Sequence, residues 1–175
     1  MTICAIVLAG SGCVRKAALA ALAALCRPVV TWGRDARREL AGLPVDVVER
    51  ESIPDALQVA LAAAPHADAA LLLRADQPSV TAADLSRLFA RFRASRAAIV
   101  ASAYEKTVGL PALFGRSLFG PLLGLAPETD VRSVIAANWR EVTVVSIPRA
   151  APQIESAEEL AMLRERAPRR SPGNR

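Results

Sequence analysis

The sequence predicts an α/β protein, a three-layer α/β/α sandwich built on a Rossmann-like, mostly parallel sheet. Short segments rich in branched apolar residues alternate with alanine-rich helical patterns along the chain. Such alternation favours parallel strands joined by right-handed crossovers. One segment, 69–75, is apolar almost throughout, as expected of a strand covered on both faces. It stops at Asp76, Gln77 and Pro78, and proline disfavours continuation of a strand.

Six strands are predicted from β-branched enrichment between turn residues. In chain order they are 2–9, 28–32, 45–49, 69–75, 97–103 and 142–147. The helix after Pro78 should begin with a capping box at Thr81 and Asp84. Its apolar stripe, expected to pack on the sheet, is Leu85, Leu88, Phe89 and Phe92. A last helix is expected from a second capping box at Ser156 to Pro168.

The length of 175 residues suits one domain, expected over 1–167, followed by a disordered basic tail over 168–175. No apolar stretch approaches the ~20 residues of a membrane span, so we expect no membrane partner. The first residues lack the basic region of a signal peptide, which suggests a cytoplasmic protein. The net charge of +5 comes almost entirely from arginine, without a basic patch interleaved with aromatics. We therefore expect no nucleic-acid partner.

The cysteines are also consistent with a cytoplasmic protein. Cys4, Cys13 and Cys26 form an odd set whose spacings match no zinc-binding pattern. They indicate free thiols in a reducing compartment, with neither a disulfide nor a structural zinc.

Asp76 is the first candidate functional residue. It should lie at the carboxyl end of its strand, where open α/β sheets bind ligands. A carboxylate there suits a divalent cation held against the phosphates of a nucleotide. Capping of the following turn explains an aspartate equally well, so the residue alone leaves both interpretations open.

A second candidate is the connection between the first strand and the first helix. Its glycines would let backbone N–H groups face an anion, and the helix start adds a positive dipole end. The predicted nucleotide-binding residues are Leu8, Ala9, Gly10, Ser11, Gly12 and Cys13, followed by the basic pair Arg15 and Lys16. An ordinary strand-to-helix turn explains this pattern equally well.

Four segments together carry a family resemblance: Ile6 to Gly10, Asp76 to Pro78, Tyr104 with Gly109 to Phe114, and Gln153 to Leu160. With these motifs in this order, residues 2–165 resemble the molybdenum cofactor cytidylyltransferases and guanylyltransferases. That family consists of nucleotidyltransferases with a Rossmann-like fold. The combination of Asp-Gln-Pro with Tyr-x4-Gly-Leu-Pro-Ala-Leu-Phe is similar to the cytidylyltransferase branch.

The resemblance implies Mg²⁺-dependent transfer of CMP from CTP, with GTP as the second choice, to molybdopterin cofactor or a related phosphate acceptor. Asp76, Arg15 and Lys16 would be the catalytic residues, and Asp76 with Glu155 would bind the metal. The acceptor would lie against Gln77, Pro78, Tyr104, Gly109, Pro111 and Arg132. Without the family, Gly109 to Pro111 is explained equally well as a common loop turn.

The chain also departs from the family pattern. The lysine of the nucleotide loop falls on Ala20, and the first carboxylate of the late motif falls on Gln153. Residues 127–132 keep Arg132 but replace both family glycines. These changes support an alternative: a catalytically degenerate protein that binds a nucleotide or cofactor and assists maturation of a molybdoenzyme.

Overall fold

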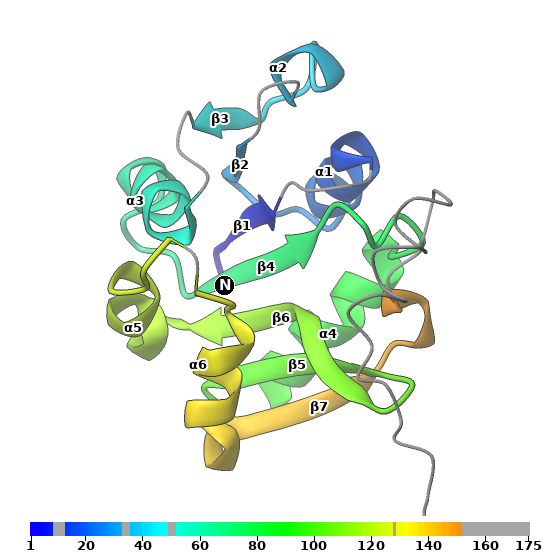
Figure 1. The fold of residues 1–175 in the computed structure, drawn as a ribbon, viewed down its shortest axis with the longest axis vertical. Helices are drawn as coiled ribbons and strands as arrows, with labels where there is room; N and C mark the ends of the chain where they lie inside the picture. Colours follow the sequence, from blue (N-terminus) through cyan, green and yellow to red (C-terminus); the bar gives the residue numbers. More distant parts are fainter. Residues whose placement is uncertain (9–12, 33–35, 49–51, 128, 152–175) are drawn as a thin grey trace, which may run out of the picture.

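The chain forms one seven-stranded sheet with helices on both faces (Figure 1). The computed structural model describes residues 1–8, 13–32, 36–48, 52–127 and 129–151. The strand order is β3-β2-β1-β4-β6-β5-β7, and β6 alone runs antiparallel to its neighbours. The strands are β1 (Ile3–Leu8), β2 (Val29–Trp32), β3 (Asp46–Val48), β4 (Ala69–Arg74), β5 (Ile99–Tyr104), β6 (Thr107–Gly115) and β7 (Val142–Ser146). The predicted α/β class is confirmed.

Two helical layers sandwich this sheet. The helices are α1 (Val14–Ala23), α2 (Ala36–Glu39), α3 (Ile53–Ala63), α4 (Ala82–Ala94), α5 (Phe119–Leu123) and α6 (Arg132–Ala137). Short 3₁₀ turns lie at Arg116–Leu118, Trp139–Glu141 and Pro148–Ala150. The apolar sides of α1 and α4 pack on one sheet face, and those of α3, α5 and α6 on the other. None of the described helices is long and apolar enough to cross a membrane.

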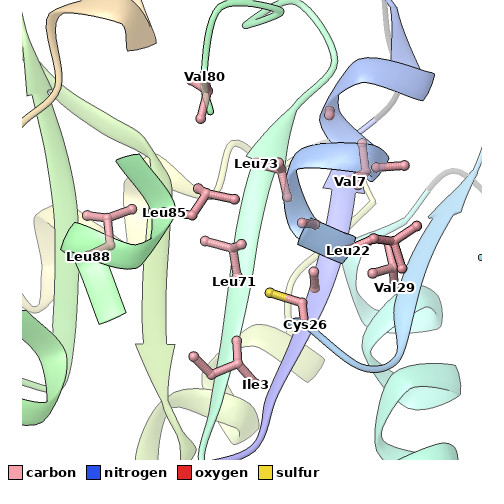
Figure 2. Close-up of a cluster of buried hydrophobic side chains, with 14 of the residues drawn as sticks. Ile3, Val7, Leu22, Cys26, Val29, Leu71, Leu73, Val80, Leu85 and Leu88 are labelled. Atoms are coloured by element: carbon pink, nitrogen blue, oxygen red, sulfur yellow. The ribbon is translucent and has the colours of Figure 1, made fainter. Parts of the chain in front are cut away.

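The central strands alternate between the two cores because successive side chains of a strand point to opposite faces. In β4, Leu71 and Leu73 join the core under α1 and α4, whereas Leu72 joins the core under α3 and α5. Figure 2 shows the first core, in which Leu71 and Leu73 lie between α1 and α4. Both faces of β4 are therefore buried, as its apolar sequence predicts.

The six predicted strands correspond to β1 to β5 and β7, with ends that differ by at most two residues. The capping box is also confirmed: the Thr81 hydroxyl accepts from the Asp84 N–H at 3.3 Å, and Asp84 Oδ2 accepts from the Thr81 N–H at 3.1 Å. The helix predicted from Ser156 and the tail 168–175 lie outside the described residues.

The interpretation of Gly109 to Pro111 as a loop turn is wrong, because these residues lie inside β6. Pairing of β6 with β4 covers only Ala112 to Gly115, and pairing with β5 shifts register between Ala101 and Ser102. Pro111 lies in the interval between these pairings, where its missing N–H costs no ladder hydrogen bond. Local irregularity of the sheet thus accommodates a proline in an internal strand.

This topology collects several chain segments at one edge of the sheet. The carboxyl ends of β1 and β4 are adjacent, since Leu8 pairs with Arg74 and the Ala75 N–H donates to the Leu8 carbonyl at 3.0 Å. The β5–β6 hairpin turns at the same edge, because β5 runs in the direction of β4 and β6 returns (Figure 1). Residues from distant parts of the chain therefore meet there.

Candidate functional site

Asp76 lies two residues after β4 at this edge and forms an ion pair with Arg74. The Arg74 Nε donates to Oδ1 at 2.8 Å and to Oδ2 at 3.1 Å, and Nη2 donates to Oδ2 as well. The Asp76 side chain is 14% exposed and that of Arg74 is 47% exposed. Hydrogen bonding to Asp76 raises the pKa of the Arg74 guanidinium above its ordinary range. The carboxylate predicted to bind metal therefore has a cationic partner already in place.

Three predicted acceptor residues converge beside this pair. A Cβ on Gly109 would lie 3.1 Å from the Tyr104 hydroxyl oxygen and 3.7 Å from Cδ of Arg132. Tyr104 ends β5, Gly109 lies near the start of β6, and Arg132 begins α6. The phenol of Tyr104 and the side chain of Arg132 thus both lie close to the backbone of Gly109. Glycine has no Cβ and therefore leaves room for them.

Charged side chains of two ion pairs act on the Tyr104 hydroxyl. Burial raises the pKa of Tyr104 above its usual value, and the positive charges of Arg74 and Arg132 partly offset that effect. Arg132 is held by Asp130: its Nε donates to Oδ2 at 2.7 Å, and its backbone N–H donates to Oδ1 at 2.9 Å. Although desolvation opposes it, hydrogen bonding from Arg132 lowers the pKa of Asp130. The result is a cluster of two arginines and two aspartates around one phenol.

Gln77 joins the turn at Asp76 to strand β6. The side chain is 2% exposed, and its Nε2 donates to the carbonyl of Leu110 at 2.7 Å and to that of Ala150. Its Oε1 is buried and has no hydrogen-bond partner among the described residues. The next residue, Pro78, is partly buried in the turn before α4. Gln77 therefore fixes Asp76 relative to β6.

Pro111 contributes its backbone to the same region. Its carbonyl accepts a hydrogen bond from the buried Ser102 hydroxyl at 2.6 Å, at the register shift between β5 and β6. Gly109 and Leu110 are buried on the same strand. The predicted Gly-Leu-Pro segment is thus part of a buried strand.

The predicted nucleotide loop is only partly described. Leu8 ends β1 beside Arg74, and Cys13 is the N-cap of α1 without a side-chain cap. Residues 9–12 lie outside the described residues. Lys16 is exposed in the first turn of α1, while Arg15 Nη1 donates to the carbonyl of Glu39 at 2.6 Å. The structure thus places Arg15 against the end of α2 and leaves Lys16 facing solvent.

Asp76 is the one predicted metal ligand within the described part of the chain, because Glu155 falls outside it. In that part, no group of three histidine, cysteine, aspartate or glutamate residues gathers as a metal site. An oxygen donor such as Asp76 suits a hard divalent cation, which would compete with Arg74 for the carboxylate.

Arg74 and Asp130 were not predicted as site residues. Arg74 is the single charged residue in the apolar run 69–75, and a charge at the end of a buried strand was the available signal. Asp130 stands where the resemblance places a glycine, and its pairing with Arg132 follows from a local turn that the sequence pattern does not reveal.

Several solved structures share this fold. The manganese complex of Rv0371c from Mycobacterium tuberculosis is 25% identical with a TM-score of 0.70, and the match covers 95% of this chain and 100% of that chain. Mth528, a nucleotidyl transferase from Methanothermobacter thermautotroptrophicus, is 17% identical with a TM-score of 0.65 and coverages of 94% and 96%. The 2-C-methyl-D-erythritol 4-phosphate cytidylyltransferase from Thermus thermophilus is 16% identical, with a TM-score of 0.62 and coverages of 93% and 97%.

Among curated protein sequences, none matches this chain closely enough to count as a relative. A family model, by contrast, matches residues 5–172, nearly the whole chain, and describes a MobA-like NTP transferase domain. The match includes Asp76 after β4 and the cluster of Tyr104, Gly109 and Arg132 on β5, β6 and α6. This chain belongs to the family of MobA-like NTP transferase domains.

Proposed function

We propose that this protein is a divalent-metal-dependent nucleotidyltransferase that transfers CMP from CTP, with GTP as the second choice, to molybdopterin cofactor or a related phosphate acceptor. One observation carries the proposal: Asp76 lies at the same sheet edge as Tyr104, Gly109 and Arg132, and this edge adjoins the end of β1. The proposed metal ligand and three of the proposed acceptor residues thus lie at one edge of the sheet, which supports a shared site. A cytoplasmic location is part of the proposal.

In the reaction, a phosphate oxygen of the acceptor attacks the α-phosphorus of the nucleotide, and the bond to pyrophosphate breaks. Arg132 is exposed and offers a guanidinium to the acceptor phosphate, while the Tyr104 hydroxyl supplies a hydrogen bond beside it. Lys16, and Arg15 if it leaves the carbonyl of Glu39, would neutralise the triphosphate from the start of α1.

Mg²⁺ would be held by Asp76, together with Glu155 from the late motif. When bound, the metal neutralises charge on the phosphates. The manganese bound to Rv0371c supports the same metal chemistry in this fold.

Substitution of Asp76 by asparagine tests the assignment. Asp76→Asn should abolish metal-dependent binding of CTP and GTP, measured by calorimetry with the Mg²⁺ complexes. The thermal midpoint should change little, because a partly exposed ion pair contributes only about 0–1 kcal/mol. Asp46→Asn, at an exposed position of β3, is the matched control and should bind as wild type does. Undiminished Mg–CTP binding by Asp76→Asn would contradict the assignment.

The ion pair between Arg74 and Asp76 also favours a second candidate, a catalytically degenerate binding protein that assists maturation of a molybdoenzyme. Ala20 and Gln153 point the same way. Pyrophosphate release with CTP, GTP or ATP and molybdopterin separates the two candidates. A true transferase should release pyrophosphate and lose most of that activity in Lys16→Ala. A binding protein should show none, and Ala20→Lys combined with Gln153→Asp should then raise activity above background.

A further inference from the structure

Arg74 lies beside both Asp76, the proposed metal ligand, and the end of β1. Its backbone pairs with Leu8, the last described residue before that loop. The three residues that precede it in β4 are buried, whereas its own side chain is about half exposed. The arginine therefore ends the strand with a cation that reaches solvent at the ligand-binding edge.

The guanidinium neutralises Asp76 through Nε and Nη2, with two hydrogen bonds of 2.8 and 3.1 Å from Nε. This planar fork matches the oxygens of a phosphate as well as those of a carboxylate. The guanidinium occupies one side of both carboxylate oxygens and its positive charge disfavours a cation beside it, so Arg74 competes with a metal for Asp76. An anion that attracts the guanidinium would therefore make the carboxylate available.

Arg74 would add a second cation on the nucleotide side to exposed Lys16 of α1. Phosphates brought near Asp76 would be repelled by its charge, and Arg15 is bound to the carbonyls of Glu39 and Ala41. Arg132 is bound to Asp130 on the acceptor side. Arg74 is the described cation that adjoins both Asp76 and the end of β1.

We propose that Arg74 is a phosphate-binding residue that exchanges partners: without nucleotide it neutralises Asp76, and with nucleotide it moves to the phosphates and leaves Asp76 to the metal. The inference rests on the proposed function, because it assumes that a nucleotide and a metal bind at this edge. It makes the two ligands cooperative, since each removes a competitor of the other.

Two equilibrium measurements test the exchange: binding of Mn²⁺ alone, and binding of CTP, with GTP in parallel, in the presence of EDTA. Arg74→Leu should tighten Mn²⁺ binding about tenfold, because the competitor of the metal is gone, and should weaken metal-free nucleotide binding about tenfold. Arg74→Gln, which keeps a polar side chain, should move both affinities in the same directions. Arg87→Leu removes an exposed cation that pairs with Asp84 on α4, and should alter neither affinity by more than about twofold.

The double variant Arg74→Leu/Asp76→Asn separates competition from a general loss of positive charge. The gain in Mn²⁺ affinity should vanish without Asp76, whereas a purely electrostatic effect would persist. If wild type binds Mg–CTP and Asp76→Asn does not, but Arg74→Leu leaves both affinities within twofold of wild type, the exchange is refuted and the proposed function stands. If wild type binds neither CTP nor Mn²⁺, both are refuted.

Discussion

Gly109 is the residue whose substitution best separates function from stability in this molecule. In Gly109→Ala the added methyl would lie 3.1 Å from the Tyr104 hydroxyl, closer than an ordinary contact, and 3.7 Å from Arg132 Cδ. The hydroxyl must shift by a few tenths of an ångström, and it can, because the Tyr104 side chain is only partly buried. The substitution thus displaces the Tyr104 hydroxyl but leaves the charged side chains of the proposed acceptor site unchanged.

The free energy of unfolding should change by less than about 1 kcal/mol. Gly109 does not have a positive φ, so alanine meets no backbone strain there. Reduced freedom of the unfolded chain favours alanine by about 0.4–1 kcal/mol. A displaced Tyr104 rotamer costs about 0.5–1.5 kcal/mol, which nearly cancels that gain. Under the proposed function, acceptor affinity should fall by about 1–2 kcal/mol, because the methyl displaces the Tyr104 hydroxyl, a hydrogen-bonding group of the proposed acceptor site.

Calorimetric titration with the molybdopterin acceptor, together with denaturant unfolding, measures both quantities. Gly120→Ala is the control: Gly120 lies on α5 with nothing within 4 Å of an added Cβ, so only stability should change there, upward by about 0.5–1 kcal/mol. Unchanged acceptor affinity in Gly109→Ala, or a loss of stability above about 2 kcal/mol, would refute the role assigned to this glycine.

Three further outcomes are expected. Tyr104 is the only tyrosine. Because burial raises its pKa, the midpoint of tyrosinate formation should lie above the ordinary value near 10, and the stability from this group should be lost as pH rises through that range; a midpoint at or below pH 10 would contradict this. A thiol reagent should label Cys13 in the folded protein, whereas Cys4 and Cys26, whose pKa values burial raises to about 11 and about 12, should react only after unfolding; fast labelling of three thiols would exclude this packing. Thr81→Ala should destabilise the protein by about 0.5–2 kcal/mol in chemical unfolding through loss of the capping box, and an unchanged midpoint would argue against it.

Much of the fold could be predicted because its cause is local. The apolar run 69–75 and the capping residues Thr81 and Asp84 reveal β4 and the start of α4 from composition alone. Strand β6 could not be predicted in this way, since Gly109 and Pro111 are turn formers by local propensity. Their strand conformation depends on a register shift and on the Ser102 hydroxyl, neither of which the sequence pattern specifies.

For the candidate site, too, the sequence predicts some features and not others. The position of Asp76 after a strand and the proximity of Tyr104, Gly109 and Arg132 could be predicted from motifs. The hydrogen-bond and ion-pair partners of these residues could not be predicted from the motifs. Whether Arg74 turns toward Asp76 depends on the path of one tight turn, which propensity does not determine.

The β5–β6 hairpin carries Tyr104 and Gly109 in one short stretch of chain, with an exposed turn at Glu105 and Lys106 between the strands. Its far end is anchored by the pairing of Ala112 to Gly115 with β4. Under the proposed function, exchange of residues 104–111 would change the part of the acceptor site that this hairpin supplies, while Gln77, Pro78 and Arg132 stay on other elements. The hairpin can therefore vary as a unit without a change in β1 or α1.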